Sequence, residues 1–488
     1  MNKPIRRVSV FCLVLILALM IRVNYVQGVE AASLNKNTNN ARGTIEAYSY
    51  PRGAIIAGGK ALTKDLLVNG NKYKYRRAYT SGPMYAPVTG FSSQVYGSNF
   101  LENLEDPILS GNDSALFFHN TLDLLTGKQK QGGDVLTTID PKVQAAAWNQ
   151  FKDSGKKGAA VALDPTTGAI LGLVSAPSYD PSTIAGADQS ASDAWVKLTK
   201  DPANPMLNRA LRQTYPPGST FKLVTAAAAL ETGKITDINA PTDSPDPYPL
   251  PDTANATLVN EAGDNCRNVS MNDALRVSCN TVFGKLGDEI GNARMAQEAD
   301  KFGFNNSKLL IPDGVAASVF DTGINRPQNV QSSIGQFDTR ATPLQMAMVA
   351  SAIVDNGTLM KPYLVTKTQS ANLVPVDQTK PTQLSQATTP QVAQQLQTMM
   401  ENVVQNGTGH NAAIPGVTVG GKTGTAQNGV DNKNNPYAWF VSYAKDSDGK
   451  EIAVAVVVED SNAARNEISG SGLAAPIAKA MMQAYLNK

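Results

Sequence analysis

The pattern of apolar and polar positions first predicts one membrane helix. The run VSVFCLVLILALMI carries no charge, and after Arg22 the residues VNYV continue an apolar segment that spans 8–26. That length is close to the roughly 20 residues that cross the hydrocarbon core of a bilayer. Because basic residues precede the segment within 1–7, the positive-inside tendency predicts a cytoplasmic tail there and an exported remainder.

A cleaved signal peptide is the alternative interpretation of this segment. The small-residue sequence Val29-Glu30-Ala31 is compatible with cleavage. We favour the uncleaved anchor because the apolar segment continues past Arg22. Both interpretations export the rest of the chain, after a polar linker over 27–42 that includes LNKNTNN.

The next stretch, 43–150, has no long helical period. It mixes glycine, tyrosine and short apolar runs, which predicts a small β-containing domain. Near its end, GGDVLTTID predicts a strand over 132–140. PKVQAAAWNQF follows with apolar residues at helical spacing and proline at the first position, where proline is favoured, and predicts a helix.

The largest predicted domain, 151–488, has strands at both ends and helices between them. GAAVALDPTTGAILGLVS is two apolar runs around a turn sequence, which predicts a hairpin over 158–175. AWFVSYA and EIAVAVVVE flank the turn KDSDGK and predict a second hairpin, after a strand over 417–427. LAAPIAKAMMQAYL predicts an amphipathic C-terminal helix. This order predicts an α+β domain whose antiparallel sheet is closed by sequence-distant segments and covered by helices.

Composition excludes several classes of function. The formal net charge of +2 over 488 residues gives no indication of nucleic-acid binding. The two histidines and three cysteines have no spacing that assembles a zinc site, so we expect no metal and no cofactor. His119 and His410 are isolated, which makes a Ser-His-Asp triad a poor hypothesis, and we interpret both as structural.

The segment TYPPGSTFKLVTAAAALETG contains a candidate nucleophile. Ser219 opens a helical run that carries no charge between Lys222 and Glu231. Residues three apart share a helix face, so Ser219 and Lys222 point into one space. A serine nucleophile needs a base, and burial lowers the pKa of a lysine because it disfavours the charged form. The pattern therefore predicts a serine with a lysine base, and a plain helix N-cap is the alternative role of Ser219.

Two further motifs make the serine hypothesis more specific. Serine-x-x-lysine occurs five times in the chain, and serine-x-asparagine also five times, so neither is informative alone. The sequence S-C-N at 278–280 ends the helical stretch SMNDALRV. The sequence K-T-G at 422–424 occurs once, in a predicted strand whose glycines permit close approach of another backbone.

The ordered set S-x-x-K, S-x-N and K-T-G resembles the signature of penicillin-binding proteins and serine β-lactamases. The wider sequence resembles class B penicillin-binding proteins. NRALRQTYPPGSTFK, ALRVSCNTVF, SIGQFDTRATPLQMA and GGKTGTAQ are similar to successive transpeptidase segments, and PRGAIIAGGKAL to the start of the non-catalytic pedestal. RAYTSGPMYAPVTGF and YGSNFLENLEDPILSG are most similar to actinobacterial members of the family.

The resemblance implies a fold and a domain order. It implies a serine transpeptidase/β-lactamase-like domain over 151–488, with a five-stranded antiparallel sheet, helices on both faces and an all-helical subdomain. A smaller, dimerisation-like pedestal over 43–150 would precede it, after one transmembrane helix over 8–26.

The resemblance also implies peptidoglycan D,D-transpeptidation, in which a serine attacks the carbonyl between two D-alanines of a stem peptide. The terminal D-alanine leaves, and an amine of a neighbouring stem takes the acyl group; β-lactams mimic the D-alanyl-D-alanine end. Carried over by position, the catalytic residues are Ser219 as nucleophile, Lys222 as base, Ser278 as proton relay, and Lys422. The substrate-binding residues are Asn280, Thr423, Gly424 and Thr425.

Three finer roles follow from the same resemblance. The backbone N–H groups of Ser219 and Thr425 form the oxyanion hole. Lys422 and Thr425 bind the terminal carboxylate, and Asn280 binds the side-chain amide of the substrate. Lys422 is also a second ammonium that lowers the pKa of Lys222.

Cys279, between Ser278 and Asn280, has two interpretations. We favour a small buried side chain that faces the helical core, without a bond to another cysteine. The alternative is a disulfide with Cys266, which export permits. Cys12 lies in the membrane segment and has no evident partner.

Other functions remain as alternatives. A β-lactamase of the kind that uses a glutamate to activate water is disfavoured, because no glutamate occurs over 299–400. A D,D-carboxypeptidase differs only in using water as acceptor, and a non-enzymatic β-lactam sensor or division scaffold needs no complete motif set. The resemblance implies a single-pass cell-membrane protein with an extracytoplasmic catalytic domain. Its expected partners are stem peptides, β-lactams, a polytopic membrane glycosyltransferase and division proteins.

Overall fold

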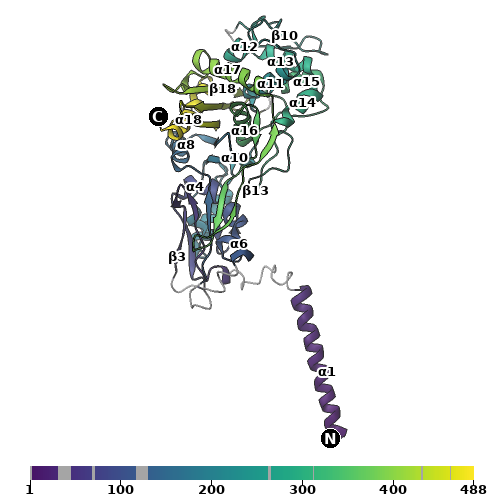
Figure 1. Ribbon diagram of the computed structural model, residues 1–488, viewed down its shortest axis with the longest axis vertical. Helices are drawn as coiled ribbons and strands as arrows, with labels where there is room; N and C mark the ends of the chain where they lie inside the picture. The colour runs from purple at the N-terminus through teal and green to yellow at the C-terminus, as the bar shows by residue number, and fades with distance from the viewer. Residues whose placement is uncertain are drawn as a thin grey trace.

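The computed structural model describes residues 3–30, 45–68, 72–116, 130–261, 265–311, 313–429, 432–461 and 463–487. His119 and most of the predicted linker lie outside these ranges. The described chain forms an N-terminal helix, a smaller part around β3 (Thr63–Leu67) and α6 (Asp106–Leu109), and a larger part that carries the C-terminus (Figure 1).

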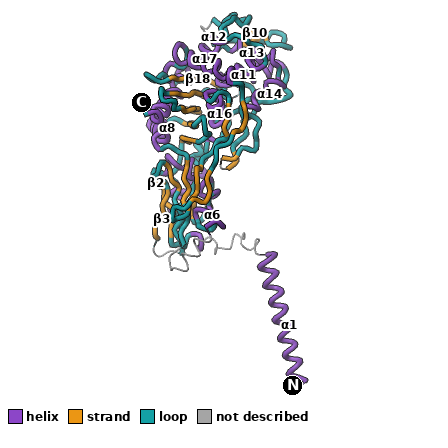
Figure 2. Tube along the Cα trace, viewed as in Figure 1, coloured by secondary structure: helices purple, strands orange, loops and turns teal. Residues whose placement is uncertain are grey.

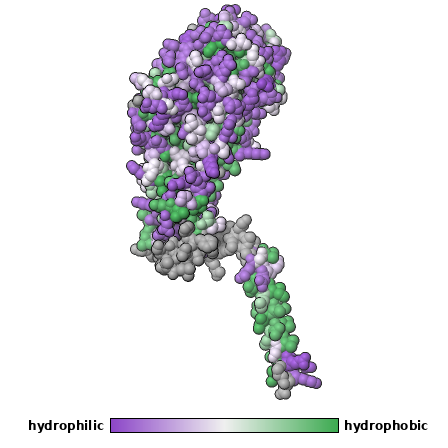
Figure 3. Space-filling view, in the orientation of Figure 1, coloured by the Kyte–Doolittle hydropathy of each residue, from purple (hydrophilic) through white to green (hydrophobic). Residues whose placement is uncertain are grey.

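The N-terminal helix has the length and composition of a membrane span. α1 (Lys3–Tyr25) continues as a π-helical turn, η1 (Val26–Glu30), and together they are long and apolar enough to cross a bilayer. No residue of α1 is buried against the rest of the described chain, and Figure 3 shows a hydrophobic surface along the middle of the helix, with hydrophilic residues at both ends. Such a surface is stable in hydrocarbon rather than in water.

A five-stranded sheet forms the centre of the smaller part, in the order β16-β15-β7-β1-β2. Its strands are β1 (Ile55–Ala57), β2 (Lys60–Ala61), β7 (Asp134–Thr137), β15 (Val365–Gln369) and β16 (Pro375–Gln378). The strand predicted over 132–140 is present as the shorter β7. Neighbouring strands are antiparallel except β1 and β7. β15 and β16 come from the middle of the predicted second domain, so the sheet of the first part is completed by a much later segment.

The larger part contains the expected five-stranded antiparallel sheet, in the order β18-β19-β20-β8-β9. Its strands are β8 (Lys157–Leu163), β9 (Ile170–Ala176), β18 (Thr418–Ala426), β19 (Tyr437–Lys445) and β20 (Glu451–Asp460). β8–β9 and β19–β20 are the two predicted hairpins. Pairing of β20 with β8 closes the sheet between the two ends of the domain, as the order of elements predicts.

Helices cover both faces of this sheet. α8 (Pro141–Ser154) and α18 (Ala475–Leu486) pack on one face, and α16 (Pro343–Val354), buried along its whole length, packs on the other. Alternate residues of β8 therefore face different cores: Ala159 belongs to the core with α16, and Ala160 to the core with α8 and α18. Because helices cover both faces of the sheet, residues that point to either face are buried, and the strands are therefore continuous apolar runs. The predicted fold class is confirmed.

The expected boundary at position 150 lies inside α8. This helix packs on β9 and α18, so its contacts are with the larger part, although it directly follows β7 of the smaller part.

A group of helices stands beside the sheet, farthest from α1 (Figure 2). The helices are α11 (Lys222–Glu231), α12 (Met271–Val277), α13 (Asn280–Ile290), α14 (Asn292–Lys301), α15 (Arg326–Ser332) and α17 (Pro390–Asn406). Two short ladders, β10 (Tyr248–Pro249) with β11 (Thr257–Leu258) and β12 (Leu310–Ile311) with β13 (Asp313–Gly314), accompany this largely helical group. α11 is buried from Lys222 to Leu230, which explains its uncharged sequence.

Candidate active site

The predicted nucleophile lies in a tight turn between the sheet and α11. Ser219 is half-buried in the 3₁₀ turn η4 (Gly218–Phe221), and Lys222 follows as the first residue of α11, with no exposed surface. Gly218 has φ +53°, a left-handed conformation that favours glycine, and a Cβ there would lie 3.1 Å from the Cβ of Ala426. The glycine of the P-P-G sequence therefore lets Ser219 approach β18.

The S-x-N motif lies at the junction of α12 and α13. Ser278 ends α12 with φ +68°, which is unusual for a residue other than glycine, and the chain turns there into α13. This turn brings the carbonyl and the hydroxyl of Ser278 toward α11. Lys222 Nζ donates to Ser278 O at 2.6 Å, to Asn280 Oδ1 at 2.7 Å and to Ser278 Oγ at 3.3 Å.

The lysine of the K-T-G motif reaches the same hydroxyl from β18. Lys422 is fully buried, and its Nζ donates to Ser278 Oγ at 2.9 Å and to Thr423 O at 3.1 Å. Burial lowers the pKa of Lys422 to about 7, while the charge of Glu261 acts in the opposite direction. A substantial fraction of this amine is therefore neutral near pH 7.

The structure brings the three predicted motifs together. Both lysine amines contact Ser278 Oγ, and Asn280 joins them through its side-chain oxygen. Ser219, Asn280 and Thr425 line one cavity of about 490 Å³. The hydroxyl that both lysine amines contact is that of Ser278.

The remaining K-T-G residues have different surroundings. Thr423 and Thr425 lie two positions apart on β18 and therefore on one face of the strand. Thr425 lines the cavity, whereas the hydroxyl of Thr423 hydrogen-bonds that of Thr408 at 2.7 Å. A Cβ on Gly424 would lie 3.0 Å from Pro217 O, so this glycine permits the contact between β18 and η4.

Asn260 is a site residue that sequence reasoning missed. Its Oδ1 accepts from the backbone N–H of Asn280 at 2.6 Å and of Thr281 at 3.0 Å, which caps the first turn of α13. The carbonyl of Val259 accepts from Asn280 Nδ2 at 3.0 Å. An asparagine that caps a helix from a distant loop leaves no local pattern, so no sequence signal could have identified it.

Cys279 is bonded to Cys266, with 5.8 Å between their Cα atoms. The favoured prediction of an unbonded Cys279 is wrong, although both cysteines are fully buried, as a core position requires. The reason is a contact between distant segments: Val259 and Asn260 hydrogen-bond Asn280, and Cys266 lies beside Cys279, the residue before α13. Cys12 is free and lies exposed on α1.

The described residues offer neither a metal site nor a buried histidine as an alternative catalytic centre. The described residues contain no group of three or more His, Cys, Asp or Glu side chains that could hold a metal ion. His410 lies in the turn η5 (His410–Ala412), after α17, and is exposed.

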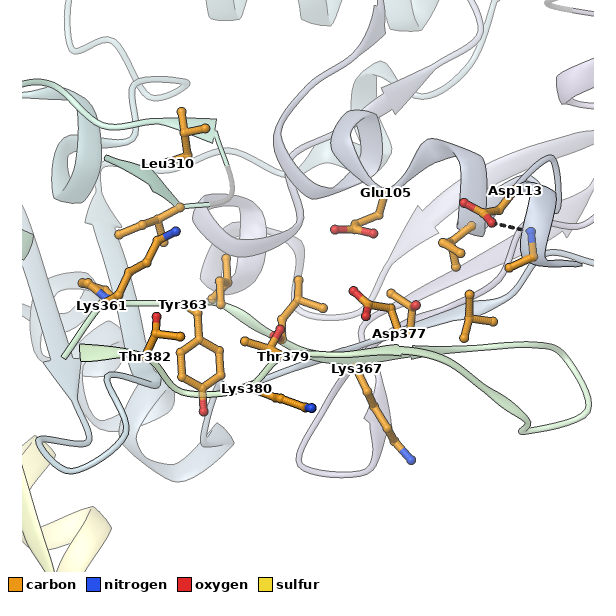
Figure 4. Close-up of a pocket in the computed structure, with 18 residues that line it drawn as sticks. Glu105, Asp113, Leu310, Lys361, Tyr363, Lys367, Asp377, Thr379, Lys380 and Thr382 are labelled. Atoms are coloured by element: carbon orange, nitrogen blue, oxygen red, sulfur yellow. Dashed lines mark hydrogen bonds between the residues drawn. The ribbon is translucent and has the colours of Figure 1, made fainter. Parts of the chain in front are cut away.

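A larger cavity, of about 720 Å³, lies beside the β15–β16 hairpin (Figure 4). Glu105 and Asp377 lie on one side of this hairpin, and Lys367 and Lys380 extend to the other. No serine or cysteine is among its lining residues, so it offers no nucleophile of the kind found at Ser219.

Comparison with known proteins agrees with this geometry. The family described as penicillin binding protein transpeptidase domain matches residues 158–483, and the penicillin binding protein A dimerisation domain matches 52–135. The chain is 42% identical to the peptidoglycan D,D-transpeptidase PbpA of Mycolicibacterium smegmatis over all of both chains. It is 39% identical to the protein of that name from Mycobacterium tuberculosis, over 100% of this chain and 99% of the relative.

Solved structures of penicillin-binding protein A from M. tuberculosis have the same fold. Its ceftriaxone acyl-enzyme complex has a TM-score of 0.84 at 39% identity and covers 91% of this chain and 100% of that one. Its penicillin G acyl-enzyme complex has a TM-score of 0.83 and covers 90% of this chain. Family match, full-length identity and shared fold agree with the resemblance read from the motifs, and this chain belongs to the class B penicillin-binding proteins.

Proposed function

We propose that this protein is a peptidoglycan D,D-transpeptidase that cross-links stem peptides through an acyl-enzyme on Ser219. The observation that carries the proposal is the convergence of Lys222 and Lys422 on the hydroxyl of Ser278, next to a cavity that Ser219 lines. A serine, two amines and a relay hydroxyl are the groups that acyl transfer without histidine requires. The name and the acyl-enzyme complexes of the similar proteins support the same reaction.

In the acylation step, Ser219 Oγ attacks the carbonyl carbon of the penultimate D-alanine. The serine proton passes to the neutral member of the lysine pair, with Lys222 as the base three residues from the nucleophile. The C–N bond then breaks, and the terminal D-alanine leaves with a proton delivered through Ser278. The hydrogen bonds from Lys222 and Lys422 to Ser278 Oγ, at 3.3 Å and 2.9 Å, support this relay.

Substrate and transition state are held by β18 and α13. Backbone N–H groups of Ser219 and Thr425 stabilise the oxyanion, an arrangement whose loss typically costs about 10²–10³ in rate for each donor. Lys422 and Thr425 bind the terminal carboxylate, and Gly424 lets β18 approach η4. Asn280 binds a substrate amide through its Nδ2 group, which now donates to Val259 O.

The cellular arrangement follows from the domain order. We propose that α1 anchors the protein as a single membrane span, with a pedestal over 43–150 and the transpeptidase domain over 151–488 outside the cytoplasm. The apolar helix and the two family matches support this arrangement. Because neither match is to a glycosyltransferase, the glycan strands come from a partner, for which we propose a polytopic membrane glycosyltransferase that acts with division proteins.

The test uses the full-length protein in detergent and compares wild type with two serine-to-alanine variants. Wild type and Ser154→Ala should form a covalent benzylpenicillin adduct by mass spectrometry, whereas Ser219→Ala should not. Ser154 is the matched control because it begins another serine-x-x-lysine sequence, yet lies exposed at the end of α8 and outside the cavity. With a pentapeptide donor and an amine acceptor, wild type should release D-alanine and form the cross-linked amide. An adduct that persists in Ser219→Ala contradicts the assigned nucleophile, and D-alanine release to water alone indicates a carboxypeptidase.

A further inference from the structure

The cavity beside Ser219 is lined by one charged side chain of each sign. Among its described lining residues Glu261 is the only carboxylate and Arg465 the only cation. Arg465 is engaged by its own chain, since its guanidinium donates to the carbonyl oxygens of Asn434 at 2.5 Å and Asn432 at 2.6 Å. Glu261 is exposed, and no lysine or arginine of the described ranges lies within ion-pair distance of it. The cavity therefore presents one exposed carboxylate, that of Glu261, to an incoming ligand, while the guanidinium of Arg465 is held by backbone carbonyls.

Glu261 is held next to the catalytic groups by its neighbours. The two residues before it, Val259 and Asn260, hydrogen-bond the first turn of α13, which also carries Asn280. The position of Glu261 is thus tied to the turn that begins two residues after Ser278. Its charge acts on Lys422, which agrees with this proximity.

An acceptor amine needs such a charge because of the two lysines. A primary alkylamine with a pKa of about 10.4 is almost entirely an ammonium ion at neutral pH. The ammonium approaches a site in which Lys222 and Lys422 converge on one hydroxyl, and like charges repel it. A carboxylate at the wall of the cavity reduces this repulsion and raises the local concentration of the cationic acceptor.

We propose that Glu261 forms the acceptor subsite and binds the primary ammonium group of the acceptor stem peptide. This inference rests on the proposed transpeptidase function and names the acceptor class, a peptide with a cationic alkylamine. The ammonium first gives one proton to the neutral member of the lysine pair. The amine nitrogen then forms a bond to the acyl carbon, the bond from that carbon to Ser219 Oγ breaks, and the second amine proton goes to Ser219 Oγ. The products are an amide, a free serine and a protonated lysine that later releases its proton to solvent.

The experiment measures how the acyl-enzyme divides between water and an added acceptor. Full-length protein in detergent is given a D-alanyl thioester donor, and the ratio of amide to acid product is determined by chromatography. One acceptor is a lysine-containing stem tripeptide, whose side-chain amine is an ammonium ion near neutral pH, and the other is hydroxylamine, which is neutral. The variants are Glu261→Gln, which keeps the shape, and Glu261→Lys, which reverses the charge. Glu289→Gln is the matched control, since Glu289 is an exposed carboxylate on α13 that pairs with Lys285 and does not line the cavity.

With the tripeptide, Glu261→Gln should lower the ratio about 1.5-fold to fivefold, the range of one exposed ion pair, and Glu261→Lys should lower it further. With hydroxylamine, the ratio should change much less. Raising salt from about 0.05 M to about 0.5 M should weaken the wild-type preference for the tripeptide and leave Glu261→Gln nearly unaffected. Glu289→Gln should behave as wild type.

Equal ratios in wild type and Glu261→Gln with the tripeptide overturn the inference while wild type still forms the amide. A parallel fall with both acceptors also overturns it, because the loss is then not one of charge recognition. If wild type forms neither the amide nor a penicillin adduct, the proposed function fails and the acceptor subsite fails with it.

Discussion

The rate of acylation should follow the protonation of the buried lysine pair. Lys422 has no exposed surface, and burial lowers its pKa from 10.5 to about 7. At pH 7 about half of this amine is neutral, against roughly 0.03% of an ordinary lysine. The amount of neutral amine in the lysine pair, to which the base Lys222 belongs, thus differs by about a thousandfold, which is the upper limit of what burial contributes to the rate at that pH. Because Lys222 and Lys422 share Ser278 Oγ, the measured midpoint belongs to the pair.

The perturbation is Lys422→Arg, which keeps a cation on β18 but cannot supply a neutral amine, because a guanidinium stays protonated. Wild-type acylation by a fluorescent penicillin should rise about tenfold per pH unit below pH 7 and level off above it. In Lys422→Arg the inflection near pH 7 should be lost, and the rate at about pH 8 should fall by about 10²–10³.

The assay is rapid quenching followed by gel fluorescence, on full-length protein between about pH 5.5 and 9.5. Lys361→Arg is the control, since Lys361 is an exposed lysine that lines the other cavity. A wild-type rate that does not change with pH over this range would refute the reasoning. So would a Lys422→Arg profile with the wild-type midpoint.

Two further predictions concern the segment that holds α13. Replacing both Cys266 and Cys279 by serine removes a disulfide with a sequence separation of 13. This should lower the free energy of unfolding by about 3 kcal/mol and reduce the melting temperature in a thermal scan. An unchanged melting temperature in the absence of reductant would contradict this prediction. Asn260→Ala removes the acceptor of two backbone N–H groups at the start of α13. The loss of this cap costs about 1–2 kcal/mol, and we expect it to slow acylation by penicillin about tenfold. Asn260→Asp should restore most of the rate, because its carboxylate accepts the same bonds and is favoured at a helix N-terminus, and equal rates in the alanine and aspartate variants would argue against this positioning role.

Features that depend on neighbouring residues could be predicted from the sequence. The apolar segment 8–26 predicts α1, because length and absence of charge suffice for a span. Paired apolar runs around Asp-Pro-Thr-Thr-Gly predict β8 and β9, and the proline at the start of α8 marks its first turn. The spacing of Ser219 and Lys222 places them together for the same reason, since one helical turn is a local structure.

Only the tertiary structure determined which residues far apart in the chain contact each other. β15 and β16 join the sheet of β1 and β7, Asn260 caps α13, and Cys266 reaches Cys279. The meeting of Lys222 and Lys422 at the hydroxyl of Ser278 is also of this kind. No local periodicity encodes such contacts, because they depend on which packed surfaces meet when the whole chain buries its apolar side chains. The sequence by itself determined the chemical groups and their local elements, and the packing of distant segments decided which atoms of those groups touch.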